Sequence, residues 1–523
     1  MKKSLLFCFA SAVLLLNTSS VKAQTFPQPN TFSFQANDFN LSGISSGSFF
    51  NDPVYFSPGL KYLTKSLIYS TSLWFGGKDN QGQVYGAFQT YGQNGYDIVG
   101  GPAADIYDEN SVFNIWNTQF YITKAEVENH IANWESPGYN VPFNINQWPT
   151  RGSSALGESE FLAPFEDLNG NQLYEPQLGE YPRFPGDYCI LSIYNDNRPH
   201  EESFCQVVKA EVLQYIYWFD AENYPTLKNV VFSKHHLRNR STIFYSEFKT
   251  GLFVDGDLGN YSDDYLGSDP SLNLCYYYNG DEEDEGPLGF GTASPALGIV
   301  QLHGEFSGVI GDIFSVPQSL GQYTCSQYYQ ALSRLWSDGS ALTSGGTGYQ
   351  TGAPTNFIYN DQEDWTESSA GNAPGDRRAL ICTDIDQFGP NDVICLDYAF
   401  VFHLDSLKNS NAVDVLKSQV AEVRSNSIIQ SLTSNCDISL SLNELPDSKG
   451  ILKVFPNPSN AWVQFNTEKN TTISIYDVQG RLINRFNCEG NCSWNSTEAS
   501  FGVLIIVAES KDGIRTTQRL VKY

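Results

Sequence analysis

The chain has 523 residues, is 14% aromatic and carries a formal net charge of −27 at pH 7. Abundant Tyr, Phe and Gly with a single Met favour a mainly β fold, and the length allows roughly two to four domains. The acidity argues against nucleic acid or an anionic membrane as a partner. It fits a secreted protein that binds divalent cations, or one that is simply very soluble, and charge alone does not separate the two.

The first 23 residues have the pattern of a secretory signal peptide. Lys2 and Lys3 precede an apolar run from Leu5 to Leu16, and residues 21–23 resemble a cleavage site. This run is too short to cross a membrane, and no later run reaches about 18 apolar residues. We therefore expect a mature chain that begins at Gln24 and has no transmembrane segment.

Residues 24–430 are expected to form a β-rich extracellular body with one, two or more subdomains. Two apolar runs, 71–77 and 83–88, are separated by a turn sequence and predict a β-hairpin. The segment Leu213–Leu252 contains three strand-like stretches, with a turn predicted at 239–241 before the last. It is predicted to form the centre of a β-sandwich.

Two stretches of the body have helical periodicity. Ala125–Trp134 places apolar Val127, Ile131 and Trp134 on one face. Val413–Ile429 repeats apolar residues at intervals of three and four. The polar stretch 431–449 has no pattern and is predicted to be a linker.

Nine cysteines remain after the signal peptide is removed. Export permits disulfides, and their spacing matches no zinc-binding pattern. Sequence does not fix connectivity, so the pairs are hypotheses based on proximity: Cys189–Cys205, Cys382–Cys395, Cys488–Cys492 and Cys275–Cys325, which leaves Cys436 unpaired.

The segment 254–264 contains four carboxylates and no Lys or Arg. Like charges placed so closely repel one another unless a cation or solvent separates them. Gly256 and Gly259 are expected to let the backbone turn so that oxygens converge. Ca²⁺ accepts six to eight oxygen ligands in irregular geometry. We hypothesise a Ca²⁺ site with ligands Asp255, Asp257 and Asp263, and with Asp264 as a fourth; the alternative is a solvated acidic loop.

A second candidate Ca²⁺ loop spans residues 167–175. Its proposed ligands occupy positions 1, 3, 5 and 9, as in EF-hand-like or dockerin-like loops: Asp167, Asn169, Asn171 and Glu175. The loop departs from the pattern because glycine stands at position 4 and Leu178 at position 12. Glu180 could replace the missing acid. The alternative is an Asn/Gly turn. The acidic run 281–285 is expected to be a solvated loop.

Catalytic motifs are weak in this sequence. Residues 43–47 fit a G-x-S-x-G pattern but lie in a polar stretch that lacks the strand–turn–helix context of a nucleophile elbow. His235 and His236 are adjacent on a predicted strand, so they should point to opposite faces. Paired carboxylates of the glycosidase type remain an open alternative because acids are so numerous.

The C-terminal stretch Ile451–Tyr523 alternates short apolar strands with turns and predicts a small Ig-like β-sandwich of about six or seven strands. It contains the ordered motifs FPNP, YDVQGRLI, FGVLIIV and RLVKY. With these motifs it resembles the type A C-terminal sorting domain of type IX secretion system cargo in Bacteroidetes-type bacteria. That family often has Tyr where Leu504 and Ile505 stand, and usually lacks Cys488 and Cys492.

This resemblance implies that residues 450–523 are recognised by the type IX translocon and its shuttle and sortase machinery. It also implies removal of the domain, followed by release or by anchoring to surface lipopolysaccharide. More loosely, the body resembles large secreted cargo proteins of no established activity. The expected function is therefore a secreted or surface-anchored, calcium-stabilised protein with a structural, adhesive or binding role. The alternative is an extracellular hydrolase acting on polysaccharide or protein.

Overall fold

The computed structural model describes residues 28–92, 95–108, 111–281, 283–311, 323–405, 411–433, 436, 452–455, 461–467, 470–477, 481–497, 499, 502–509, 511 and 515–522. The chain divides into two compact units between Ser439 and Leu440. The expected signal peptide lies outside the described residues, as does most of the expected linker. Residues 431–433 of that linker are helical.

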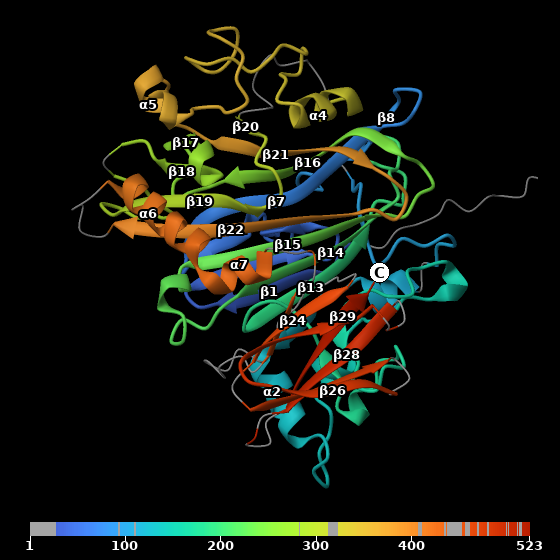
Figure 1. The fold of residues 1–523 in the computed structure, drawn as a ribbon. Coiled ribbons are helices and arrows are strands. Elements are labelled where there is room, and N and C mark those ends of the chain that lie inside the picture. Colours follow the sequence, from blue (N-terminus) through green and yellow to red (C-terminus); the bar gives the residue numbers. More distant parts are fainter. Residues whose placement is uncertain are drawn as a thin grey trace, which may run out of the picture. The chain divides into compact units, whose positions relative to one another are not determined.

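The body is built on two nine-stranded sheets in which neighbouring strands run antiparallel (Figure 1). The first sheet, here called sheet A, has the order β1 (Thr31–Ala36), β2 (Phe39–Ile44), β3 (Ser48–Phe49), β7 (Lys65–Lys78), β16 (Tyr245–Gly256), β21 (Arg377–Phe388) and β20 (Gly308–Gly311), with β6 (Leu60–Tyr62) and β8 (Val84–Ala87) paired to β7.

The second sheet, sheet C, has the order β10 (Phe120–Thr123), β13 (Tyr188–Asn195), β14 (Ala210–Trp218), β15 (Val230–Asn239), β22 (Val393–Asp405), β19 (Ser294–His303), β18 (Leu274–Asn279) and β17 (Asp264–Asp269), with β9 (Val99–Gly100) paired to β13. Two small two-stranded sheets complete the strands of the body: β4 (Asn51–Asp52) with β5 (Ser57–Pro58), and β11 (Phe165–Glu166) with β12 (Tyr181–Pro182).

The main core lies where the two sheets face each other. Phe49 of sheet A contacts Phe400 of sheet C with ring centroids 6.0 Å apart, and Phe50 contacts the same ring at 5.0 Å. On β14, Val212 and Ile216 belong to this core. Leu213 and Tyr215 lie on the opposite face of the strand and are also buried, so sheet C is covered on both sides here. The mainly β, sandwich-rich fold predicted from the sequence is confirmed.

Six helices, or parts of helices, are described in the body: α2 (Lys124–Asn133), α3 (Phe143–Asn146), α4 (Cys325–Leu332), α5 (Glu367–Ala370), α6 (Ala412–Ser425) and α7 (Ser427–Thr433). In Figure 1, α6 runs along β19 and β22 of sheet C, while α4 lies against β7, β8, β16 and β21 of sheet A. Single turns connect the larger elements: η1 (Val112–Trp116), η2 (Ser154–Leu156), η3 (Pro176–Leu178), η4 (Pro225–Leu227), η5 (Pro270–Leu272) and η6 (Asp361–Glu363).

Both predicted helices are present, with differences that have local causes. A capping box between Thr123 and Glu126 starts α2 one residue early. In α2, Val127 and His130 are buried whereas Ile131 is exposed, so the predicted apolar face is rotated. The second helix is divided at Asn426, which has extended backbone angles and whose side chain accepts a hydrogen bond from the N–H of Ile428.

The predicted hairpin is confirmed as β7 and β8, with Phe75 opposite Ala87. The predicted strands β14, β15 and β16 are also present. However, the turn at 239–241 joins β15 in sheet C to β16 in sheet A, so these two strands are consecutive but do not pair. The connection therefore crosses from one layer of the sandwich to the other.

The C-terminal unit contains seven described strands in two sheets: β23 (Leu452–Phe455), β24 (Trp462–Thr467) and β27 (Asn491–Asn495) in one, and β26 (Leu482–Cys488), β25 (Thr471–Asp477), β28 (Gly502–Glu509) and β29 (Arg515–Lys522) in the other. Val463, Phe465, Ile473, Ile475 and Ile506 belong to its separate core. The small terminal β-sandwich is confirmed.

Three disulfides are formed: Cys205–Cys325, Cys395–Cys436 and Cys488–Cys492. The predicted Cys488–Cys492 pair is confirmed. The other three predicted pairs are wrong because proximity in sequence does not report which strands lie side by side. Buried free cysteines are present in the body: Cys189, Cys275 and Cys382. Among the described residues, no helix is both long and apolar enough to cross a membrane.

Candidate cation sites

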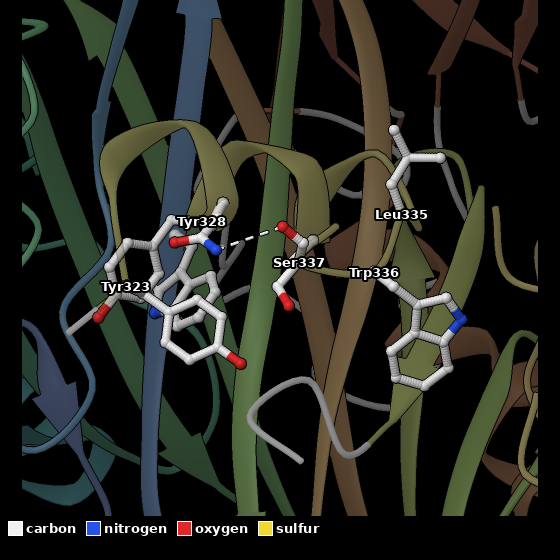
Figure 2. Close-up of a pocket in the computed structure, with 8 residues that line it drawn as sticks. Tyr323, Tyr328, Leu335, Trp336 and Ser337 are labelled. Atoms are coloured by element: carbon white, nitrogen blue, oxygen red, sulfur yellow. Dashed lines mark hydrogen bonds between the residues drawn. The ribbon is translucent and has the colours of Figure 1, made fainter. Parts of the chain in front are cut away.

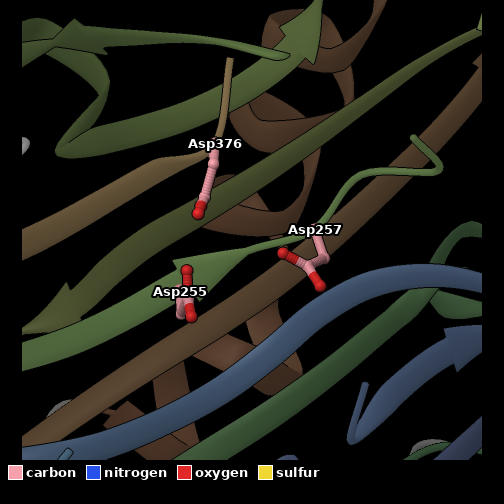
Figure 3. Close-up of side chains that lie close together, drawn as sticks. All are labelled: Asp255, Asp257 and Asp376. Atoms are coloured by element: carbon pink, nitrogen blue, oxygen red, sulfur yellow. The ribbon is translucent and has the colours of Figure 1, made fainter. Parts of the chain in front are cut away.

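The acidic triad Asp255, Asp257 and Asp376 lies at one end of sheet A. Asp255 is near the end of β16, Asp257 follows that strand, and Asp376 immediately precedes β21. β16 and β21 pair with Asp255 opposite Arg378, which places the three carboxylates together. One oxygen of each lies within 4.8 Å of the others. Figure 3 shows the side chain of Asp376 pointing toward the two earlier aspartates.

Arg378 and Tyr91 hold this cluster in place. The Tyr91 hydroxyl donates to Asp255 Oδ2 (2.7 Å) and accepts from Arg378 Nε (2.7 Å). Arg378 Nη2 donates to Asp376 Oδ2 (2.8 Å), and its Nε lies 3.3 Å from Asp255 Oδ1. Asp255 Oδ1 and Asp376 Oδ1 are buried atoms that accept no hydrogen bond. Oxygen ligands are therefore available on a fixed frame.

Burial raises the pKa of Asp255 to about 7, even though the Arg378 guanidinium opposes this shift. Burial also raises the pKa of Asp257 to about 8, and the neighbouring Asp255 and Asp376 carboxylates add to the effect. The cause is that a carboxylate loses hydration when it is buried and is further disfavoured by like charges. At neutral pH this site favours either protons or a bound cation.

Asp263 and Asp264, the other two predicted ligands, lie outside this triad. Asp264 is buried and its Oδ2 accepts a hydrogen bond from the N–H of Leu258 (3.0 Å). Asp263 Oδ2 accepts from the side chain of Asn260 (2.7 Å). Burial, with the neighbouring carboxylates adding to it, raises the pKa of Asp264 well above its usual value. The structure thus separates the predicted ligand set into two neighbouring acidic groups.

The two glycines of this segment have different roles. Gly259 has φ of +66°, and a Cβ there would meet Asp284 Oδ2 at 1.9 Å, so glycine is needed for the turn and for the approach of that carboxylate. Gly256 does not turn: it belongs to β16, and a Cβ there would collide with the ring of Tyr277.

The run 281–285 is not uniformly solvated. Asp281 is exposed, but Asp284 is buried and accepts hydrogen bonds from the N–H groups of Asn260 and Phe290, both at 2.8 Å. The expectation of a solvated loop is therefore wrong for Asp284. Its carboxylate is used to fix the neighbouring turn.

The loop at 167–175 is exposed and internally hydrogen-bonded. Asp167 accepts from the N–H groups of Gly170 (2.7 Å) and Gln172 (2.8 Å). The side-chain amides of Asn169 and Asn171 donate to Glu175 Oε2 at 3.0 and 2.6 Å. The four predicted ligands therefore form one compact loop in which every one of them is already bonded to another loop residue.

Glu180, the suggested replacement for the missing twelfth ligand, lies at the base of this loop. It is buried, and its Oε2 accepts a hydrogen bond from the N–H of Glu175 (2.6 Å). Its Oε1 is buried without a hydrogen-bond partner. Glu180 is therefore placed to brace the loop from the inside.

The weak catalytic pattern at 43–47 has a structural role. Ser45 is buried next to Asn117, with which its hydroxyl forms a short hydrogen bond, and it accepts one from the N–H of Asn30. The prediction for the adjacent histidines is confirmed: His235 packs against Phe49 in the main core, while His236 faces the other side of sheet C.

A small aromatic cavity lies beneath α4 (Figure 2). Its lining includes Trp74, Tyr328 and Trp336, and its volume is about 10 Å³. This is room for about one water molecule and not for a larger ligand.

Residues 453–523 match a protein-family model described as a secretion system C-terminal sorting domain. The chain is cargo of the type IX secretion system. The cargo protein is accordingly secreted or displayed on the cell surface, and its C-terminal unit is the part that the secretion machinery recognises.

No curated protein matches the cargo protein. Among solved structures, a polysaccharide lyase is similar at 9% identity and a TM-score of 0.19 over 60% of this chain and 34% of the lyase. A putative aldose 1-epimerase from Escherichia coli is similar at 8% identity and a TM-score of 0.25, over 72% and 99% of the respective chains. Dimeric latent PorU from Porphyromonas gingivalis is similar at 10% identity and a TM-score of 0.12, over 64% of this chain and 31% of PorU. The cargo protein thus spans about a third of the lyase, and these likenesses are too weak to indicate a function.

Proposed function

We propose that the body is a structural or binding protein of the cell exterior, stabilised by Ca²⁺ bound at Asp255, Asp257 and Asp376. The observation that supports this proposal is the convergence of three carboxylate oxygens within 4.8 Å at a partly buried end of sheet A. The triad would carry three negative charges when ionised, and Arg378 supplies one positive charge. A divalent cation would neutralise the remaining two charges.

Calcium suits this set better than a transition metal does. The triad offers only carboxylate oxygens, which are the ligands of hard cations, and has no His or Cys. Three side chains from two strands do not form a complete cage, so backbone carbonyls or water would complete the shell. Ca²⁺ tolerates such irregular shells more readily than Mg²⁺ does.

The test is isothermal titration calorimetry of the full mature chain with CaCl₂ after treatment with chelator. We expect saturable binding and a rise in melting temperature that EGTA reverses. Because carboxylates with raised pKa values must lose protons, the heat should also depend on the ionisation enthalpy of the buffer. Absence of both binding heat and thermal shift would overturn the proposal.

We also propose that the shuttle and sortase components of the secretion system recognise the sorting unit, and that the processed body is attached to surface lipopolysaccharide. A fusion of residues 450–523 to an inert reporter should be exported, trimmed and either released or found in the outer-membrane fraction. Retention of the reporter in the periplasm, while a control sorting tail works, would contradict the recognition step. Release of all processed reporter to the medium would contradict anchoring.

The hydrolase alternative needs a cleft with two carboxyl groups at opposite sides of a bond to be cleaved. Among the described residues that line the two cavities, none has an acidic side chain. In the triad, Asp255 and Asp376 are both engaged by Arg378. The geometry therefore favours a cation-binding role for these acids over general acid and base catalysis.

A further inference from the structure

A second, larger cavity lies on the face of sheet C that points away from the main core. Its volume is about 170 Å³. Nine residues line it: Phe161, Leu162, Pro164, Leu213, Tyr215, His236, Arg238, Val393 and Cys436. All of them belong to the body, and the cavity shares no residue with the acidic triad.

The alternation of strand side chains builds the floor of this cavity. Leu213 and Tyr215 on β14 and His236 and Arg238 on β15 occupy the outward positions of paired strands, with Leu213 opposite His236. The Tyr215 and His236 rings meet nearly edge to face, 5.9 Å between centroids. The floor is therefore a fixed part of the sheet.

Covalent and loop contacts form the walls. His236 pairs in register with Cys395 of β22, and Cys395 is bonded to Cys436, which lines the cavity. The segment that contains Phe161 and Leu162 supplies an apolar wall opposite. The cavity is therefore preformed by a sheet, a disulfide and a packed segment.

Two buried polar groups in this lining have no hydrogen-bond partner among the described residues. Tyr215 is fully buried, and its hydroxyl forms no hydrogen bond. His236 Nε2 is likewise buried without a partner. Arg238 is half-buried and has no hydrogen bond or close ion pair among the described residues, but it lies opposite the buried Glu211 in the strand pairing, and its charge acts to lower the pKa of that carboxyl. Buried polar groups are nearly always satisfied, so a cluster of unsatisfied ones in a cavity points to a missing ligand.

These groups share the ability to donate. Arg238 is a donor only, the Tyr215 hydroxyl can donate, and neutral imidazole can donate from Nε2. Burial lowers the pKa of His236 to about 3, with Lys234 adding to the effect, so its ring is neutral at pH 7. Among the described residues of the lining, Arg238 is the one permanently charged group. No acid is among the described residues that line the cavity, and the acid nearest in the strand pairing is Glu211, opposite Arg238. The complementary ligand has acceptors and one negative charge.

We propose that this cavity binds a small monocarboxylate carried on a single six-membered ring. The apolar walls would enclose the ring, and the carboxylate would receive hydrogen bonds from Arg238, Tyr215 and His236. The cavity volume of about 170 Å³ is large enough for one six-membered ring, since an apolar cavity of about 150 Å³ in another protein holds one benzene molecule. Such a ring acid could come from two sources, an aromatic acid or a hexuronic acid.

The experiment is titration calorimetry of the full mature chain with two probes, benzoate and glucuronate, and with benzyl alcohol as the uncharged counterpart of benzoate. We expect one of the two acids to bind, which identifies the source. If that acid is benzoate, benzyl alcohol should bind at least about tenfold more weakly, because hydrogen bonds to charged groups are the stronger ones. Failure of both acids to bind at millimolar concentration would overturn the proposal.

Variants assign the binding to this cavity. Arg238→Gln should weaken binding of the acid at least about tenfold. Arg424→Gln should leave it unchanged, because Arg424 is a half-buried residue of α6 that donates to the Ser271 carbonyl and lies outside the lining. Leu213→Trp should fill the cavity and abolish binding without removing a charge. Unchanged affinity in a folded Arg238→Gln protein would overturn the proposal. Binding should persist in EGTA, which keeps this test independent of the proposed Ca²⁺ site.

Discussion

The acidic triad and the loop at 167–175 are both spaced acids near glycines, yet the structure uses them in opposite ways. The triad is fixed by sheet pairing, with buried oxygens that accept no hydrogen bond. In the exposed loop, Asp167 and Glu175 already accept hydrogen bonds from within the loop. A bound cation should stabilise a site most where the carboxylates are held in place and carry more negative charge than the protein itself neutralises. The triad meets this condition, because one arginine faces three acids. Spacing in sequence alone does not distinguish these situations.

The largest expected effect comes from removing the positive charge of the triad. In chelator, Arg378→Met should destabilise the protein by about 3 kcal/mol, because it leaves the buried Asp255 carboxylate without its charged partner. Urea denaturation measures this loss. Added Ca²⁺ should restore part of the stability, and Arg424→Gln serves as the control. A change below about 0.5 kcal/mol, as is usual for surface substitutions, would show that the guanidinium does not balance the triad.

The second expected effect, stabilisation by bound Ca²⁺, shows whether the triad or the loop at 167–175 binds the ion. At a Ca²⁺ concentration about 100 times the dissociation constant, binding should stabilise the wild type by about 2.7 kcal/mol. Asp257→Asn should remove this response, whereas Asp167→Asn should retain it. Thermal denaturation with and without EGTA gives the comparison. If Asp167→Asn alone loses the response, the roles of triad and loop are reversed.

Removal of cations should make stability depend on pH. Asp255 and Asp257 hold protons more tightly in the folded state than in the unfolded state, because their folded pKa values are raised to about 7 and about 8. Their favourable contribution is present at about pH 4 and is lost as pH rises through these values. Between pH 5 and 8.5 we expect a loss of about 2 kcal/mol in EGTA, after allowance for solvent screening.

Saturating Ca²⁺ should reverse that trend, since it replaces the protons. Asp257→Asn should flatten the profile in EGTA by removing the more strongly shifted group. The measurement is the free energy of unfolding in urea at a series of pH values. A stability that rises over this range in EGTA would contradict the raised pKa values.

The smallest expected effect concerns the loop itself. Asp167→Ala removes two hydrogen bonds to the backbone and should cost about 1 kcal/mol of local stability. Hydrogen exchange of the Gly170 and Gln172 amides should report it, with Asp281→Ala as a control at an exposed acid. Protection that falls only after Ca²⁺ is removed from the wild type would indicate that the loop, too, binds the ion.

Local pattern was sufficient for some of the strands and helices of this protein. Alternating β-branched and aromatic residues predicted β14, β15 and the terminal sandwich, and helical spacing predicted α2 and α6. What depended on pairing between distant segments could not be predicted. Asp376 is adjacent to two arginines in sequence, which suggests an ion pair, and only the pairing of β16 with β21 reveals it as a neighbour of Asp255.

The cavity on sheet C shows the same limit. Its lining was predictable in part, since His236 was expected to point away from His235. The walls come from residues near 161 and 436, and the second wall depends on a disulfide whose partner is 41 residues away in sequence. No local pattern contains that information.

The disulfide between Cys395 and Cys436 has a mechanical consequence for maturation. It ties the final described residue of the body to a central strand of sheet C, a few residues before the boundary with the sorting unit. Cleavage of the chain after Cys436 would leave all the described strands of the two body sheets in place.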